Sequence, residues 1–101
     1  REKEFFEDDI QIDKFLEEGD ILELEKESLK VIHTPGHTEG GICLLGKDFI
    51  LTGDTLFKDG YGRMDLPGGS EKEMKKSLKK IQAIASGMKA YPGHGESFLI
   101  P

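Results

Sequence analysis

Three residues in this sequence have side chains suited to binding a divalent metal, and each follows an apolar run beside a glycine. His37 lies in Thr-Pro-Gly-His-Thr, Asp54 in Thr-Gly-Asp-Thr and His94 in Pro-Gly-His-Gly. Imidazole nitrogens and a carboxylate oxygen are ligands that catalytic zinc sites use. One such histidine alone is more often a hydrogen-bonded loop residue, but the shared context favours a common metal site. Glycine-rich turns at strand ends can bring such side chains into one pocket.

The third histidine and the single cysteine are weaker candidates. His33 precedes His37 by four residues and belongs to the end of an apolar run, so we do not expect it to bind the metal. Cys43 lies among apolar residues in Gly-Gly-Ile-Cys-Leu-Leu-Gly, where a buried, unreactive thiol is the usual interpretation. Because the chain has one cysteine, it forms no disulfide framework, and we expect a reducing, cytoplasmic location.

Four apolar runs of strand length must position these residues. Residues 21–24 and 29–33 are separated by a polar Glu-Lys-Glu-Ser turn, and residues 41–45 and 49–53 by Gly-Lys-Asp. This pattern predicts two hairpins in succession, which make a meander of four strands. Residues 58–69 contain four glycines and a proline, so this segment is predicted to be a loop, and long loops are often functional.

A helix over residues 70–87 has the clearest signals. Ser70 precedes Glu73 by three residues, as in a capping box, and Gly87 stands where glycine commonly ends a helix. The apolar residues at helical spacing, expected to face the sheet, are Met74, Leu78, Ile81 and Ala85. Residues 88–95 are predicted to form a short strand that ends in a Pro-Gly turn, and residues 97–100 to begin a last strand. Residues 1–19 are expected to form an extended or loosely helical lead-in.

Length and composition limit what else the chain can be. With 101 residues, 36% of them hydrophobic and 34% charged, the sequence can form one core, so residues 1–101 are expected to be a single domain. A formal net charge of −6 does not suit binding to nucleic acid or to anionic membranes. No apolar run approaches the roughly 20 residues that span a bilayer. The sequence begins without Met and ends after an apolar run, so we expect part of a larger protein.

Four segments follow one another along the chain: HTPGHTEGGICLL, ILTGDTLF, GYGRMDLPGGS and YPGHGE. Together they resemble the second half of a metallo-β-lactamase-fold hydrolase, closest to the glyoxalase II-like (hydroxyacylglutathione hydrolase-like) group. The resemblance covers about residues 19–96 and implies an α+β fold. In such a fold this chain is the C-terminal half of an αβ/βα sandwich, with a mostly antiparallel sheet and the 70–87 helix on its outer face.

The resemblance implies a role for each candidate residue. His37 would be a ligand of the first of two metal ions, Asp54 the catalytic carboxylate that bridges both, and His94 a ligand of the second. The ions would be zinc, with iron or manganese as alternatives. Tyr61 and Arg63 match a loop that borders the substrate cleft in such enzymes. The implied reaction is hydrolysis of a small thioester or ester, such as a hydroxyacylglutathione, by metal-activated water.

One part of the family pattern is absent from the sequence. The other metal ligands of these enzymes come from a His-x-His-x-Asp-His motif, and these 101 residues hold no such string. With three histidines in total, the chain has an incomplete ligand set, so we expect it to be inactive in isolation. We expect it to pair with a missing N-terminal half or to self-associate. The contact would be the sheet face that such a half covers, left open here, or an unpaired strand edge.

Two other functions stay open at this point. Persulfide dioxygenases share the fold and a similar Gly-Arg-x-Asp loop, here residues 62–65, but use one iron ion. The Pro-Gly-His-Gly segment around His94 favours the hydrolase over such a mononuclear iron enzyme. Asp65 and Pro67 are most simply residues that shape the loop. The second alternative is a non-catalytic remnant or interaction module, and an upstream His-x-His-x-Asp-His motif would favour the enzyme instead.

Overall fold

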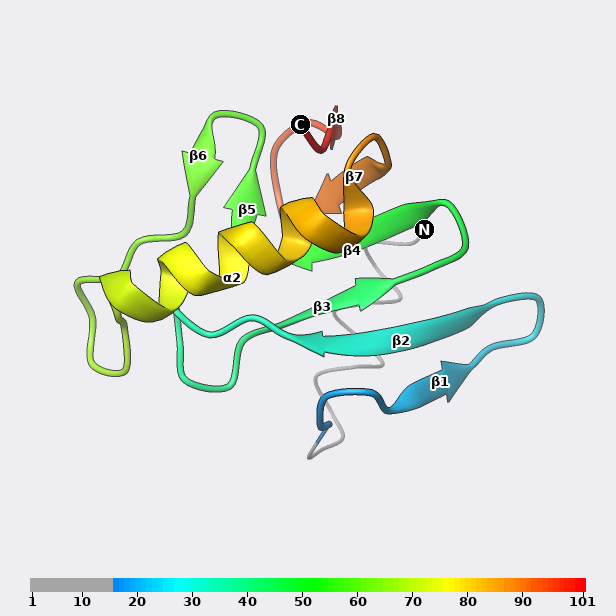
Figure 1. Cartoon of the computed structure of the whole chain (residues 1–101), viewed down its shortest axis with the longest axis horizontal. Helices are drawn as coiled ribbons and strands as arrows, with labels where there is room; N and C mark the ends of the chain where they lie inside the picture. The colour runs from blue at the N-terminus through cyan, green and yellow to red at the C-terminus, as the bar shows by residue number, and fades with distance from the viewer. Residues whose placement is uncertain (1–15) are drawn as a thin grey trace.

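One six-stranded sheet forms in the computed structural model, which describes residues 16–101, and its two central strands are apolar runs (Figure 1). The strands, in sheet order, are β1 (Ile21–Glu23), β2 (Ser28–His33), β3 (Ile42–Leu45), β4 (Phe49–Gly53), β7 (Lys89–Pro92) and β8 (Phe98–Leu99). Every neighbouring pair is antiparallel except β4 and β7, which are parallel. The two predicted hairpins, the meander and the mostly antiparallel α+β fold are therefore confirmed. Of the lead-in expected over residues 1–19, residues 1–15 lie outside the described residues, and residues 16–19 end in a turn.

Helix α2 (Glu71–Ala85) forms where the sequence predicts it and lies across one face of the sheet (Figure 1). The Ser70 hydroxyl caps the helix by accepting a hydrogen bond from the Glu73 amide at 3.1 Å. The chain leaves the helix at Gly87, whose φ of +84° is a left-handed conformation that glycine adopts easily. Local capping signals thus fix both ends of this element.

The inward face of α2 differs from the predicted one at a single turn. Three of the four residues expected there are buried, but Leu78 is only partly buried and Ser77 takes the fully buried place. The physical reason is a hydrogen bond, because the Ser77 hydroxyl donates to the Pro35 carbonyl at 2.7 Å. This turn of the helix therefore packs against a loop and not only against the sheet.

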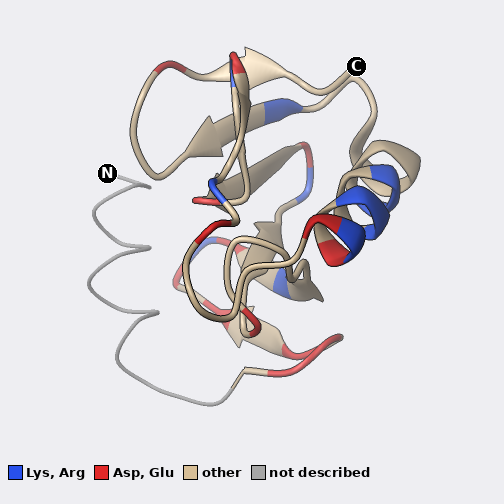
Figure 2. Ribbon diagram, turned by 90° about the vertical axis from the view of Figure 1, so that its left-hand side faces the viewer, with Lys and Arg blue, Asp and Glu red and all other residues tan. Residues whose placement is uncertain are grey.

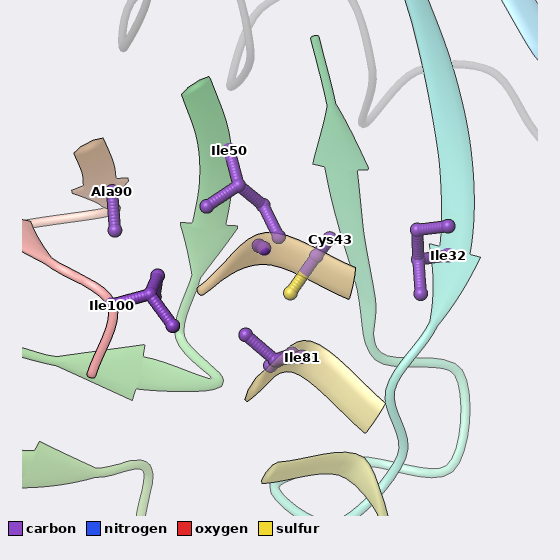
Figure 3. Packing of buried hydrophobic residues seen from close by; sticks show 7 residues of the cluster. Ile32, Cys43, Ile50, Ile81, Ala90 and Ile100 are labelled. Atoms are coloured by element: carbon purple, nitrogen blue, oxygen red, sulfur yellow. The ribbon is translucent and has the colours of Figure 1, made fainter. Parts of the chain in front are cut away.

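A hydrophobic core fills the space between α2 and the sheet (Figure 3). Strands β2, β3, β4 and β7 each contribute to it the side chains that point toward α2, because successive side chains of a strand point to opposite faces. The buried members of this core are Ile32, Cys43, Ile50, Ile81, Ala85, Ala90 and Ile100. None of them is more than 4% exposed. Burying one isoleucine-sized side chain stabilises the fold by about 1.5–3 kcal/mol, so this core holds the helix on the sheet.

The sheet face away from α2 is apolar as well. Its central residues are Leu29, Val31, Leu44 and Leu51. They are at most 2% exposed, and partly buried apolar residues such as Leu22, Phe49 and Tyr91 pack around them. The centre of this face thus has little exposed surface, and its expected contact with a missing N-terminal half or a second copy stays a prediction. Exposed apolar residues of the sheet lie on its outermost strands instead, where Ile21 of β1 is 50% and Leu99 of β8 67% exposed.

The segment 58–69, predicted to be a loop throughout, contains a short strand. Strand β6 (Gly60–Tyr61) pairs with β5 (Leu56–Phe57) in a two-stranded hairpin outside the main sheet. Lys58 and Asp59 lie between the two strands, and a two-residue connection is the commonest one in hairpins. This hairpin begins two residues after Asp54 and therefore lies next to a candidate metal ligand.

Charged residues join the start of the described chain to the sheet and the helix. Lysines gather along α2 (Figure 2), at positions 72, 75, 76, 79 and 80. The Lys80 ammonium donates to Glu18 at 2.7 Å and to the His33 carbonyl at 3.0 Å. The same Glu18 oxygen accepts the His33 amide at 2.8 Å. Over residues 16–101, no helix is long and apolar enough to cross a membrane.

Candidate metal centre

The three candidate ligands follow strands that run in one direction. His37 lies in the loop 34–41 after β2, Asp54 comes directly after β4, and His94 is the second residue after β7. Strands β2 and β4 are both antiparallel to β3, and β7 is parallel to β4. The carboxyl ends of β2, β4 and β7 therefore meet at the same end of the sheet, and the three side chains converge there.

Asp54 lies between the two histidines and presents a different carboxylate oxygen to each. Its Oδ2 is 3.9 Å from His37 Nε2, and its Oδ1 is 3.7 Å from His94 Nδ1. Both distances are too long for hydrogen bonds. Two ligands of one tetrahedral zinc ion, with bonds of about 2.0–2.1 Å, lie about 3.4 Å apart. Each histidine–aspartate pair thus has nearly the separation that a shared metal ion requires.

A backbone carbonyl fixes the tautomer of His37. Its Nδ1 lies 2.7 Å from the Arg63 carbonyl oxygen, and a carbonyl only accepts, so Nδ1 carries a proton. In the neutral ring the lone pair is then on Nε2, the nitrogen that faces Asp54. Metal-binding histidines commonly donate their other N–H in this way. Gly62 permits the close approach, since a Cβ at this position would lie 3.1 Å from the His37 Cβ and collide with the Asp54 carbonyl.

The loop that carries His37 is anchored on α2. The Ser70 amide donates to the Gly36 carbonyl at 2.8 Å, and the Ser77 hydroxyl donates to the Pro35 carbonyl at 2.7 Å. These two carbonyls belong to the residues directly before His37, so the helix sets the position of this imidazole. Ser77 is not among the sequence-based candidates. The sequence feature that could have pointed to Ser77 is a polar residue on the otherwise apolar face of a helix.

His94 is more exposed than His37, and the β5–β6 hairpin covers one side of it. The Phe57 ring lies against the imidazole, with the centroids 4.9 Å apart and the planes inclined by 31°. Lys58 in the hairpin and Glu96 after His94 form an ion pair at 2.8 Å, which raises the pKa of Lys58 and lowers the pKa of Glu96. A pocket of about 350 Å³ opens here, lined by Phe57, Lys58, Asp59, His94, Gly95 and Glu96. Sequence reasoning missed the hairpin and therefore missed these contacts.

The two residues expected to contact substrate do not line this pocket. Tyr61 of β6 is 49% exposed. The Arg63 guanidinium makes two hydrogen bonds to Asp65, at 2.7 and 2.9 Å. This pairing raises the pKa of Arg63 and lowers the pKa of Asp65. In the described residues, Arg63 thus contacts the candidate centre through its backbone carbonyl, while its charge is paired within its own loop.

The donors present fit part of a metal centre. Within residues 16–101, no group of three or more His, Cys, Asp or Glu side chains is arranged to hold a metal ion on its own. His33 uses Nε2 to bond the Glu39 carbonyl at 3.0 Å, and Cys43 is fully buried, which raises its pKa to about 11. A catalytic zinc ion has three protein ligands, whereas each pair formed with Asp54 supplies two. Further ligands would have to come from other residues of the protein.

Comparison with known proteins identifies the family. The family model of the metallo-beta-lactamase superfamily matches residues 1–94. This chain belongs to the metallo-β-lactamase superfamily. One relative is the probable metallo-hydrolase MJ0888 of Methanocaldococcus jannaschii, 43% identical over 73% of this chain and 37% of that protein. Another is the probable polyketide biosynthesis zinc-dependent hydrolase BaeB of Bacillus velezensis, 40% identical over 78% of this chain and 36% of that protein.

Two solved structures have folds similar to that of this chain. ETHE1 from Myxococcus xanthus has a TM-score of 0.79 at 30% identity, over 84% of this chain and 40% of its own. TTHA1623, solved in a di-iron-bound form, has a TM-score of 0.75 at 32% identity, over 86% of this chain and 43% of its own. The chain thus spans less than half the length of each protein named here. Zinc and iron both occur among the names of these similar proteins.

Proposed function

We propose that this chain supplies His37, Asp54 and His94 to a two-metal hydrolytic centre that a further segment of protein completes. The observation that carries the proposal is the position of Asp54, whose two oxygens face different histidines at 3.9 and 3.7 Å. A carboxylate in this position suits a ligand that two ions share. The relatives named metallo-hydrolase and zinc-dependent hydrolase support a hydrolytic reaction.

The chain's own residues hold and orient this centre. When bound, a pair of divalent ions supplies Lewis acidity and an activated water. The Arg63 carbonyl keeps the proton on Nδ1 of His37, so that Nε2 is free to bind a metal. The Phe57 ring lies against one side of the His94 ring. The pocket beside His94, about 350 Å³, has room for a small substrate.

The substrate we propose is a small thioester such as a hydroxyacylglutathione, as the resemblance to the glyoxalase II-like group implies. Zinc is the proposed metal because BaeB is named a zinc-dependent hydrolase, and the di-iron form of TTHA1623 supports iron as the alternative. A persulfide dioxygenase-like enzyme with one iron ion is the second candidate function. The observation that favours it is the Gly-Arg-Met-Asp sequence of residues 62–65.

Isothermal titration calorimetry of zinc binding to the whole protein that contains this sequence tests the ligand assignment. We expect His37→Ala, Asp54→Asn and His94→Ala each to weaken zinc binding by at least about 10-fold to 100-fold, because that range is found when only the hydrogen-bond partners of ligands are altered. His33→Gln is the matched control, because it removes the imidazole four residues before His37 and keeps an N–H donor for the Glu39 carbonyl. Equal zinc affinity in the wild type and all four variants would overturn the assignment.

Activity is measured on the whole protein that contains this sequence, loaded in turn with zinc and with iron. Hydrolysis of a hydroxyacylglutathione that Asp54→Asn abolishes would support the hydrolase. Oxidation of a persulfide with one iron bound per chain would favour the dioxygenase-like candidate. Metal binding without either reaction would favour the non-catalytic interaction module and count against both enzymes.

A further inference from the structure

Beneath the candidate metal centre lies a group of buried polar side chains. Its members are Thr34, Cys43, Thr52 and Thr55, and none is more than 3% exposed. Thr34 precedes His37 by three residues, and Thr55 directly follows Asp54. A buried hydroxyl destabilises a fold unless it has a hydrogen-bond partner, so its presence in place of an apolar group calls for a physical reason.

The hydroxyls of Thr34 and Thr55 bond to each other at 3.2 Å. Thr34 begins the loop after β2 that carries His37, and Thr55 belongs to the turn after β4 that carries Asp54. Strands β2 and β4 are not neighbours, because β3 lies between them in the sheet. The threonine bridge, as we call this pair of hydroxyls, is therefore a direct polar link between two segments that the sheet itself does not join.

Backbone hydrogen bonds extend the threonine bridge into both segments. The Thr34 amide donates to the Gly41 carbonyl at 2.8 Å and so closes the loop 34–41 around His37. On the other side, the Thr55 carbonyl accepts the Gly62 amide at 3.0 Å. Gly62 is the residue that packs between Asp54 and His37. The bridge thus lies where movement of either segment would change the distance between the two candidate ligands.

We propose that Thr34 and Thr55 are positioning residues of the metal centre, whose hydroxyl bridge sets the separation of His37 and Asp54. The inference rests on the proposed function, because it assigns the bridge to metal binding. Functional groups must be held within about 0.5 Å of their productive geometry. Valines would fill the same space at both positions and would leave the two segments unconnected.

The sharpest test replaces both threonines, because removing the Thr34 hydroxyl alone leaves that of Thr55 buried without its partner, whereas Thr34 also contacts the Cys43 thiol at 3.4 Å. Replacing both partners by apolar groups of the same shape can be nearly neutral for stability. We therefore expect Thr34→Val/Thr55→Val to melt within a few degrees of the wild type but to bind zinc about tenfold more weakly, as loss of a supporting residue does. Ile81→Val is the control, because it shortens a buried side chain of the core and leaves both segments bonded. It should lower the melting temperature without changing zinc affinity.

A second readout needs no metal. Amide hydrogen exchange by NMR reports on residue 34, which bonds Gly41, and on Gly62, which bonds Thr55. Without zinc, both amides should exchange at least about tenfold faster in the double variant than in Ile81→Val, because the bridge no longer holds either segment closed. Unchanged exchange would overturn the bridge, and faster exchange with unchanged zinc affinity would overturn its role at the metal. If the whole wild-type protein that contains this sequence binds no zinc, the proposed function fails, and amide exchange alone then decides whether the bridge holds the two segments.

Discussion

The hydroxyl of Ser77 donates to the carbonyl of Pro35 at 2.7 Å, so the middle of α2 is bonded to the loop two residues before His37. Ser77 is 2% exposed, which means that little water competes for this bond. The Ser70 amide bonds the next carbonyl, that of Gly36. Helix α2 therefore does more than cover the sheet, because it holds the segment that carries one candidate ligand.

We expect Ser77→Ala to lower both stability and zinc affinity. The lost hydrogen bond has a net value of about 0.5–1.5 kcal/mol, and 1 kcal/mol shifts the melting temperature of a domain this size by about 4–8 °C. Thermal denaturation followed by circular dichroism measures the first effect, and zinc calorimetry the second. Ser86→Ala, at an exposed residue just after α2, is the control and should change neither. A Ser77→Ala protein with the zinc affinity of the wild type would show that the helix does not position His37.

Signals between neighbours in sequence predict the elements of this fold. The features that they do not predict are contacts between residues far apart in the chain. Ser70, Glu73 and Gly87 mark both ends of the helix because capping involves neighbours in sequence. The bond between Thr34 and Thr55 joins residues 21 apart, and that between Ser77 and Pro35 joins residues 42 apart. No periodicity encodes such pairs. The three candidate ligands were recognisable because glycine-rich strand ends repeat around them, whereas their supports depend on packing.

Phe57 gives a prediction specific to His94. Because the two rings are 4.9 Å apart, ring currents of the phenyl group should shift the His94 ring protons in NMR spectra. In Phe57→Leu we expect this shift to disappear and zinc affinity to fall, since an offset aromatic pair contributes about 0.5–1.5 kcal/mol. Tyr61→Leu is the control, because Tyr61 belongs to the same hairpin and the ring pair involves Phe57. Unshifted His94 protons in the wild type would contradict the stacking.

Glu18 makes the stability depend on pH on the acid side. The hydrogen bond from Lys80 and then the His33 amide hold the pKa of Glu18 below its ordinary value of 4.5. A carboxyl with a lowered pKa in the folded state stabilises it above the unfolded pKa, and this stabilisation is lost as the pH falls through the folded pKa. At neutral pH the free energy of unfolding of the wild type should therefore exceed that of Glu18→Gln by about 0.2–1 kcal/mol, the amount typical of exposed ion pairs. The wild type should accordingly have the higher melting temperature.

Melting temperatures of the wild type and Glu18→Gln, measured from about pH 7 down to pH 3, test this dependence. The difference between the two proteins should shrink as the medium becomes more acidic than pH 4.5, the ordinary pKa of this side chain. When both proteins also carry Lys80→Gln, which removes the donor to Glu18, the difference between their melting temperatures at neutral pH should be smaller. A difference in melting temperature that stays constant over the whole pH range would mean that folding does not lower the pKa of Glu18.

The outermost strands of the sheet predict how the chain associates. In the part of the chain that the structure describes, the sheet ends at β1 and β8, and Leu99 on β8 is 67% exposed. An edge strand with an outward apolar side chain favours pairing with a second edge. We therefore expect sedimentation velocity to show concentration-dependent self-association of the purified chain, and Leu99→Lys to shift it toward the monomer. Leu66→Lys is the matched control, because it adds the same charge at a leucine that is 49% exposed in the loop before α2. A wild type that stays monomeric at every concentration, or equal dissociation by both variants, would count against association through this edge.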